Sequence, residues 1–440
     1  MIAAHQSYEE LPSPEAIAFG ELLGVSLSAS TNTLTHGLHR YPAKYIPQIP
    51  RWAIREYTAL GDTVLDPFSG SGTTLVEALA EGRNCAGIDL DPLACLIAEA
   101  KTASLSTARL ATFLPALLRL SRQTSVDLEV PLPGVGNFGH WFGQRTWSDL
   151  QALHKAIESI DILPEERSFL LVVFSSLLRA VSNADDQSQK TYVSGTLNKK
   201  PPAVFTTFEK KYVKALDGME ALNSRRSDSS CTIHIASATS MPICNGSVDL
   251  IVTSPPYLDS VDYMYNLMLE YFWLGKDLGV ASRNDYNSRR RAYIGSKKPT
   301  CGAGIPDAIR HLIKPEQVPQ YRREVLGPYF ANMSDHFREA ERVLKDGGKY
   351  VLVIGNSRSE EGMLPIHDGL IALASASGLH IEHAFGYRIR RHYMKFPRKG
   401  RGGIILVDWV ITLRKGLPCE GIPNRLPLID AQLSPDAVAH

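Results

Sequence analysis

The stretch TVLDPFSGSGTT, residues 63–74, is the strongest indicator of the fold. A short apolar run ends at Asp66, and Gly70 and Gly72 precede a helical pattern of apolar residues that stops at Gly82. Glycine has no Cβ, so the backbone can turn tightly there and approach a ligand closely. The helix that follows would present unpaired backbone amides to that ligand. The stretch therefore predicts a strand, a glycine turn and a helix, with a ligand at the turn.

A second strand and a second acid lie just downstream. Residues 84–88 form an apolar run that ends at Asp89, 23 residues beyond Asp66. This spacing suits an acid that binds the hydroxyls of a ribose. The turn is not a P-loop, because no Gly-Lys-Ser/Thr follows it, and it lacks the third glycine of the dinucleotide fingerprint. The two features together predict a ligand that contains a ribose.

The alternation of strands and helices returns later in the chain. Further strands are expected at residues 233–236, 248–252, 350–354, 380–388 and 404–413, with the last two forming an antiparallel pair. Such alternation predicts a doubly wound, mostly parallel sheet.

The rhythm of the sequence divides the chain into five parts. Residues 108–229 carry apolar residues at helical spacing and no convincing strand, which predicts a mostly helical insertion. We assign residues 1–35 to an N-terminal extension with a short helix near 15–23, 36–107 and 230–415 to the two halves of one α/β core, and 416–440 to a tail.

Composition narrows the class of protein. The 440 residues carry a net charge of +1, with 44% hydrophobic and 21% charged residues, as in an ordinary globular protein. No apolar run approaches 18 residues and no secretory signal begins the chain, so we expect no membrane association and a cytoplasmic location. The six cysteines form no CxxC pair, so neither a disulfide framework nor a metal site is expected.

A second stretch, TSPPY at residues 253–257, follows the strand predicted at 248–252. Its two prolines stiffen the turn and remove two backbone donors. The Ser254 hydroxyl and the Pro255 carbonyl remain as acceptors, which suits an amine with two hydrogens to donate. Tyr257 offers a flat face on which a base could stack.

Together these residues make the chain resemble the amino-methylating, S-adenosylmethionine-dependent DNA methyltransferases. Residues 66–74 resemble the cofactor loop of that family and residues 253–257 its catalytic motif. HRYPAK at 39–44 resembles the segment that closes over the methionine end of the cofactor, and DGG at 346–348 resembles the entry to the fifth strand. The resemblance covers residues 36–104 and 232–413. It implies a seven-stranded Rossmann-like sheet with a helical insertion.

The resemblance also implies a set of site residues. The catalytic residues are Ser254, Pro255, Pro256 and Tyr257. The residues expected to bind S-adenosylmethionine are Tyr41, Pro42, Ala43, Lys44, Asp66, Pro67, Phe68, Gly70, Gly72, Thr73, Thr74, Asp89, Leu90, Ser237 and Ala238. One departure is Ser237, which stands where the family often has an acid at the end of the third strand. Adenine binding would then use the hydroxyl of Ser237 or Thr239, or a backbone amide.

In this family Ser-Pro-Pro-Tyr usually accompanies methylation of cytosine at N4, and Asp- or Asn-Pro-Pro-Tyr methylation of adenine at N6. Ser254 therefore favours a cytosine flipped out of double-stranded DNA. Two basic stretches, 283–298 and 388–401, would hold the DNA. The residues expected to contact it are Arg289, Arg290, Arg291, Arg388, Arg390, Arg391, Lys395 and Arg398. The insertion is the first candidate for target recognition, and a restriction endonuclease is the partner expected in a restriction-modification system.

Three alternatives stay open. The first is methylation of adenine N6. The second is an RNA amine methyltransferase of the tRNA guanine type, disfavoured because only about 35 residues precede the core and such enzymes generally carry an N-terminal RNA-binding domain. The third is a non-catalytic DNA-binding scaffold, disfavoured by the intact glycine turn and TSPPY stretch.

Overall fold

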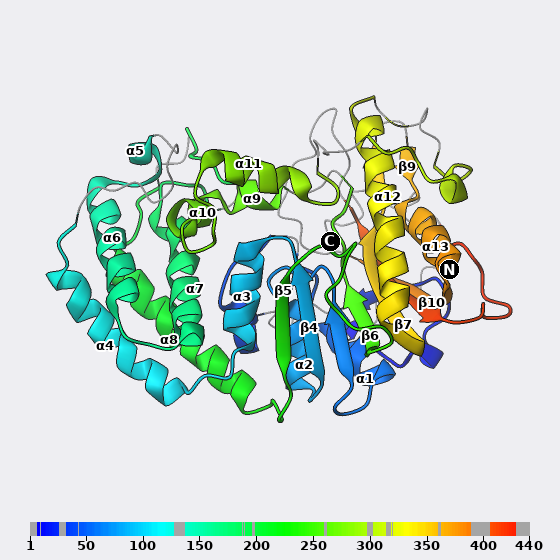
Figure 1. The fold of residues 1–440 in the computed structure, drawn as a ribbon, viewed down its shortest axis with the longest axis horizontal. Helices are drawn as coiled ribbons and strands as arrows, with labels where there is room; N and C mark the ends of the chain where they lie inside the picture. The colour runs from blue at the N-terminus through cyan, green and yellow to red at the C-terminus, as the bar shows by residue number, and fades with distance from the viewer. Residues whose placement is uncertain are drawn as a thin grey trace.

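The computed structural model describes residues 7–8, 10–25, 32–42, 44–126, 137–186, 188, 190–195, 199–258, 262–296, 302–313, 318, 320–359, 362–388 and 405–427. Its centre is a nine-stranded sheet flanked by helices (Figure 1). The strand order is β1-β2-β10-β11-β7-β6-β3-β4-β5. Along the chain the strands are β1 (Ser7–Tyr8), β2 (Glu21–Val25), β3 (Thr63–Asp66), β4 (Asn84–Asp89), β5 (Cys231–Ile235), β6 (Val248–Thr253), β7 (Leu344–Gly355), β10 (Leu379–Arg388) and β11 (Val407–Lys415).

The doubly wound, mostly parallel sheet predicted from the sequence is confirmed. Strands β5, β4, β3, β6 and β7 pair in parallel, and β11 runs antiparallel to both β7 and β10. The expected antiparallel pair at the end of the core is therefore confirmed as well. A separate antiparallel hairpin joins β8 (Ser357–Ser359) to β9 (Gly362–Leu364).

Two expectations about the N-terminal part were wrong. The sheet has nine strands instead of seven, because β1 and β2 extend it beyond β10. The helix expected near residues 15–23 is replaced by a short 3-10 helix, η1 (Pro14–Ala16), followed by β2. The reason is tertiary: β10 offers an unpaired edge, and Leu22 and Leu23 pair in parallel with Gly386 and Tyr387.

Helices cover both faces of the sheet, as alternating strand residues show. Val64 packs with residues of α1 (Gln48–Tyr57) and α2 (Thr73–Ala80). The next residue, Leu65, packs on the opposite face with α12 (Gln320–Val343) and α13 (Ile366–Ala376). Successive side chains of a strand point to opposite faces, so both faces must be apolar.

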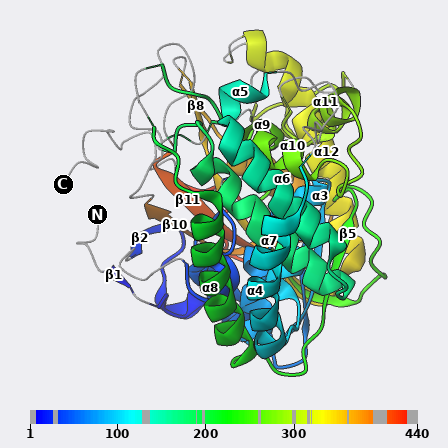
Figure 2. The same ribbon diagram turned by 90° about the vertical axis from the view of Figure 1, so that its left-hand side faces the viewer.

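The insertion is helical throughout its described residues, as predicted. Its helices are α4 (Thr107–Gln123), α5 (Phe138–Trp141), α6 (Gln144–Ser159), α7 (Pro164–Val181) and α8 (Val204–Asn223). They stand together at one end of the molecule, where α4, α7 and α8 run side by side (Figure 2). No described helix is both long enough and apolar enough to span a membrane.

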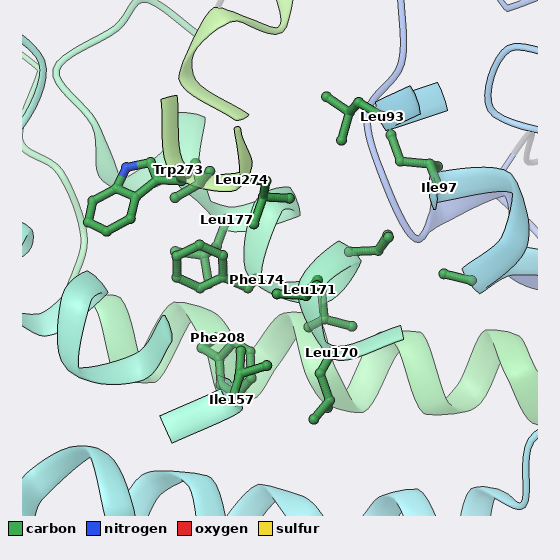
Figure 3. Close-up of a cluster of buried hydrophobic side chains, with 14 of the residues drawn as sticks. Leu93, Ile97, Ile157, Leu170, Leu171, Phe174, Leu177, Phe208, Trp273 and Leu274 are labelled. Carbon is green, nitrogen blue, oxygen red and sulfur yellow. The ribbon is translucent and has the colours of Figure 1, made fainter. Parts of the chain in front are cut away.

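The insertion shares one apolar core with the rest of the chain (Figure 3). Phe174 and Leu177 of α7 lie in the same cluster as Leu93 of α3 (Pro92–Thr102) and Trp273 of α10 (Met268–Leu274). All four side chains are at most 2% exposed. The insertion is therefore packed against the segment that follows TSPPY as well as against the cofactor half of the core.

Candidate active site

A cavity opens where β3, β4 and β6 end. Its empty space amounts to about 730 Å³, open solvent at its mouth included. Its walls come from the glycine turn, the end of β4, the segment after β5 and the TSPPY stretch. The lining residues are Tyr41, Lys44, Tyr45, Pro67, Phe68, Ser69, Gly70, Ser71, Thr73, Asp89, Leu90, Ala236, Ala238, Ser254, Pro256, Tyr263, Tyr293 and Ile294. Thus the two stretches singled out in the sequence meet in one cavity.

The glycine turn has the geometry that requires glycine. Gly70 and Gly72 have φ angles of +47° and +78°, in the left-handed region. A Cβ on Gly70 would lie 3.2 Å from the Tyr41 ring, and one on Gly72 would lie 3.1 Å from the Cβ of Ala98. Gly72 lies outside the cavity wall and lets α2 begin close against α3.

A buried lysine supports the turn from behind. Lys101 of α3 is fully buried, and its Nζ donates to the carbonyl oxygen of Ser71 at 2.9 Å. Burial lowers the pKa of Lys101 well below its usual range. No local pattern signals this contact, because the lysine lies in an otherwise ordinary apolar helix.

Asp66 joins the two stretches and lies outside the cavity wall. Its carboxylate accepts from the Thr74 hydroxyl at 2.5 Å and the Thr253 hydroxyl at 2.6 Å, and from the Phe68 amide at 3.1 Å. The side chain is 1% exposed, and burial raises its pKa to about 6. The structure therefore gives Asp66 and Thr74 a bracing role, in place of the cofactor contact expected from the sequence.

Asp89 does line the cavity. Its Oδ2 accepts from the Gly70 amide at 2.8 Å and its Oδ1 from the Asp91 amide at 2.9 Å. Burial, with the nearby charge of Asp91, raises the pKa of Asp89 to about 7. The carboxylate thus fixes the turn while its remaining lone pairs stay available to a ligand.

The TSPPY stretch divides between the cavity and the sheet. Ser254 and Pro256 line the cavity, whereas Pro255 is buried and Tyr257 turns toward the antiparallel strands. The Tyr257 hydroxyl donates to Oδ1 of Asp408 at 2.9 Å. Asp408 lies on β11, 151 residues further along the chain, so no local signal announced it.

Comparisons with known proteins relate the chain to DNA methyltransferases. A family model described as DNA methylase matches residues 7–100. The Type II methyltransferase M.MvaI of Kocuria varians is 26% identical over 404 residues, covering 85% of this chain and 86% of that protein. The Type II methyltransferase M.MjaII of Methanocaldococcus jannaschii is 40% identical over 93 residues, 21% of this chain and 18% of that protein. The chain is therefore similar to the amino-methylating DNA methyltransferases, over residues 7–100 by the family model and over most of its length by M.MvaI. Members of this family use S-adenosylmethionine.

Among solved structures, the rRNA methyltransferase aviRa of Streptomyces viridochromogenes is 12% identical over 86% of this chain and 88% of that chain, with a TM-score of 0.31.

The cavity fits S-adenosylmethionine, the cofactor of the methyltransferases that the chain resembles. The hydroxyl oxygens of Ser69 and Ser71 are buried and have no hydrogen-bond partner among the described residues. Both serines flank Gly70 and line the cavity together with Asp89. Unpaired hydroxyls, a carboxylate and the ring of Phe68 together offer partners for the polar and flat parts of a nucleoside.

Three stacked tyrosine rings, from three separate segments of the chain, form one wall of the cavity. No single segment predicts this wall. Tyr41 stacks on Tyr263 of α9 (Tyr263–Asn266) with ring centroids 6.1 Å apart and planes at 23°. Tyr263 in turn stacks on Tyr293, at 6.5 Å and 25°. Only Tyr41 was expected in the site. The wall therefore joins the segment before the cofactor turn to the segment after TSPPY.

The segment after β5 differs from its prediction at Ser237. Ala236 and Ala238 line the cavity, but the Ser237 hydroxyl lies 2.7 Å from that of Thr239 and outside the lining. His336 of α12 supports the segment, since its Nδ1 donates to the Ala238 carbonyl at 3.0 Å. Burial lowers the pKa of His336 to about 4, so the ring is neutral near pH 7.

The HRYPAK segment reaches the cavity through Tyr41 and Lys44, whereas Pro42 lies outside the lining and Ala43 outside the described residues. Arg40 points to the insertion, where its guanidinium donates to the carbonyls of Asp186 and Ser188 at 3.2 and 3.0 Å. The segment therefore connects the cavity wall to a loop of the insertion.

The first basic stretch forms α11 (Arg283–Ala292), which lies with α9 above the sheet in Figure 1. Arg290 forms an ion pair within the protein, since its Nε donates to Oδ2 of Asp262 at 2.7 Å. Arg291 is exposed and Arg289 half-buried. In the second stretch, Arg388 ends β10, and Arg390, Arg391, Lys395 and Arg398 lie outside the described residues.

Proposed function

We propose that this methyltransferase methylates the exocyclic N4 amine of a cytosine flipped out of double-stranded DNA. The observation that carries the proposal is the meeting of Ser254 and Pro256 with Gly70 and Asp89 in one cavity. A cofactor held at the glycine turn would then face an amine held at TSPPY.

The cofactor half of the cavity would hold S-adenosylmethionine as follows. The turn presents Gly70 and the hydroxyls of Ser69 and Ser71, and Asp89 takes the ribose hydroxyls. Phe68 and Leu90, with Ala236 and Ala238 opposite, enclose the adenine. The residues before the turn, Tyr41 and Lys44, cover the methionine end. When bound, the cofactor supplies a methyl group activated by a positively charged sulfur.

The catalytic half would orient the amine. The lone pair of a cytosine amine is delocalised into the ring, so the amine is a poor nucleophile. Acceptors at the Ser254 hydroxyl and the Pro255 carbonyl would bind its two hydrogens and favour a tetrahedral nitrogen whose lone pair faces the methyl group. Tyr257 lies outside the cavity lining, and its ring would form the stacking face for the flipped base when DNA is bound. Catalysis then rests on alignment and on preorganised dipoles.

The DNA would be held by α11 and by the basic stretch that follows β10. Arg289 and Arg291 would contact phosphates of the DNA backbone. Arg388 and the rest of the basic stretch 388–401 would make a second set of phosphate contacts. The insertion selects the target sequence. A restriction endonuclease with the same target would be the functional partner.

The test is nucleoside mass spectrometry of DNA from a methylation-free host that expresses the chain. We expect N4-methylcytosine, and we expect it to fall to the host background in a Ser254→Ala control. N6-methyladenine in place of N4-methylcytosine would support the second candidate, adenine methylation, with the same cavity. If neither modified base is found in DNA, the proposal fails, and host RNA is the next substrate to analyse.

A further inference from the structure

We infer that Asp408 is a positioning residue of the methyl transfer: it holds the Tyr257 hydroxyl so that the Ser254 oxygen faces the target amine as an acceptor. The inference rests on the proposed function and extends it to β11, a strand that contributes nothing to the cavity wall.

The Asp408 carboxylate has a phenol on each oxygen. Tyr257 donates to Oδ1 at 2.9 Å, and Tyr387 of β10 donates to Oδ2 at 3.0 Å. Asp408 pairs with Tyr387 on one side and with Gly355 of β7 on the other, and it is 8% exposed. Hydrogen bonds to a carboxylate are shorter and stronger than neutral ones, so both rings are held firmly.

Gly355 of β7 lies close beside the ring of Tyr257. A Cβ on Gly355 would lie 3.3 Å from Cε2 of Tyr257 and 3.0 Å from Oδ1 of Asp408. It would also lie 2.4 Å from Cγ2 of Ile405, so a side chain at this position would force its neighbours to shift. The end of β7 therefore leaves room for the ring and the carboxylate to meet.

The direction of the hydrogen bonds gives this contact a chemical consequence. A carboxylate can only accept, so the Tyr257 hydroxyl is the donor in its hydrogen bond with Asp408. Among the groups around Tyr257, the Ser254 hydroxyl acts to lower the pKa of the phenol, as a group that donates to the phenol oxygen does. The lone pairs of the Ser254 oxygen are thereby free for the substrate. Burial and the charge of Asp408 raise the pKa of Tyr257 well above its usual range, which keeps the phenol protonated.

A double-mutant cycle of Asp408→Asn and Tyr257→Phe tests the inference. The readout is the single-turnover rate of tritiated methyl transfer from S-adenosylmethionine to unmethylated genomic DNA, with saturating enzyme. We expect each single variant to be roughly 10- to 100-fold slower, because a misplaced acceptor costs about that much. The double variant should be no slower than the slower single variant within about threefold, since Asp408 acts through Tyr257.

Tyr387→Phe is the matched control. It removes the other phenol from the same carboxylate, and we expect its rate to stay within about threefold of the wild type. All variants should bind S-adenosylmethionine with affinities within about twofold of the wild type, because Asp408 lies outside the cavity.

Three results would overturn the inference. The first is a double variant whose slowing equals the product of the single effects. The second is an unchanged rate in Tyr257→Phe, a test that does not depend on the folding of Asp408→Asn. The third is a Tyr387→Phe variant as slow as Asp408→Asn.

Failure of the proposed function would look different, because the wild type itself would then modify no DNA. In that case the same cycle is measured by urea unfolding, and additive changes in the free energy of unfolding would overturn the contact itself.

Discussion

Replacing Asp66 by asparagine should change how the stability of this methyltransferase depends on pH. Burial raises the pKa of Asp66 to about 6 in the folded chain, against an ordinary value of 3.8. The folded state therefore holds the proton at pH values where the unfolded chain has already released it. Stability from this group is fully present below pH 3.8 and is lost as the pH rises toward 6. Asparagine keeps the shape of the side chain and has no proton to lose.

The size of the effect follows from the same two values. A difference between 3.8 and about 6 corresponds to about 3 kcal/mol, at 1.36 kcal/mol per pH unit. About 2 kcal/mol of this falls between pH 4 and pH 7. Because Asp66 is 1% exposed, solvent screening removes little of it. The stability of Asp66→Asn minus that of the wild type should therefore rise by about 2 kcal/mol from pH 4 to pH 7.

Urea unfolding of both proteins at a series of pH values measures this difference and cancels the other titrating groups. Asp89→Asn is the matched control for function. Asp89 lines the cavity and Asp66 does not, so only Asp89→Asn should weaken the binding of S-adenosylmethionine, by about tenfold or more. A stability difference that stays constant with pH would refute the reasoning. A stability difference that falls as the pH rises would also contradict this expectation, since it would mean that an ion pair favours the charged form of Asp66 in the folded chain.

Three further changes test other parts of the structure. Gly72→Ala should lower the free energy of unfolding in urea by about 2–3 kcal/mol, because strain at positive φ adds to a close contact with Ala98. Gly246→Ala is the control: its φ is also positive but its surroundings are open, so it should cost about 1 kcal/mol. Phe174→Ala should cost about 3–5 kcal/mol by the same measurement, since the ring is fully buried in the shared core. Arg291→Ala should weaken DNA binding and lower the slope of the logarithm of the binding constant against the logarithm of the salt concentration by about 1. Arg290→Ala should leave this slope unchanged, because the charge of Arg290 is already paired with Asp262. Equal slopes for the two variants would contradict this expectation.

Local patterns predicted most of the core. Apolar runs followed by Asp66, Asp89 and TSPPY were confirmed as strands that end at one cavity, because short buried strands and glycine turns leave clear periodic signals. The helix predicted near residues 15–23 was wrong, because pairing with the free edge of β10 outweighed the local helical pattern. Local preference decides little where a sheet edge is available.

The alternation of strands and helices, the glycine turn and the two stretches that meet at the cavity can be predicted from the amino-acid sequence. Each is a local property, because a strand, a turn and a helix follow from neighbouring residues. Which polar side chains face the cavity depends on the tertiary fold. It turned Asp66 inward to brace Thr74 and Thr253, left Asp89 at the surface of the cavity, and brought Asp408 to Tyr257 from the far end of the chain. Contacts between distant segments depend on strand order and register, and these are set by the packing of the whole sheet.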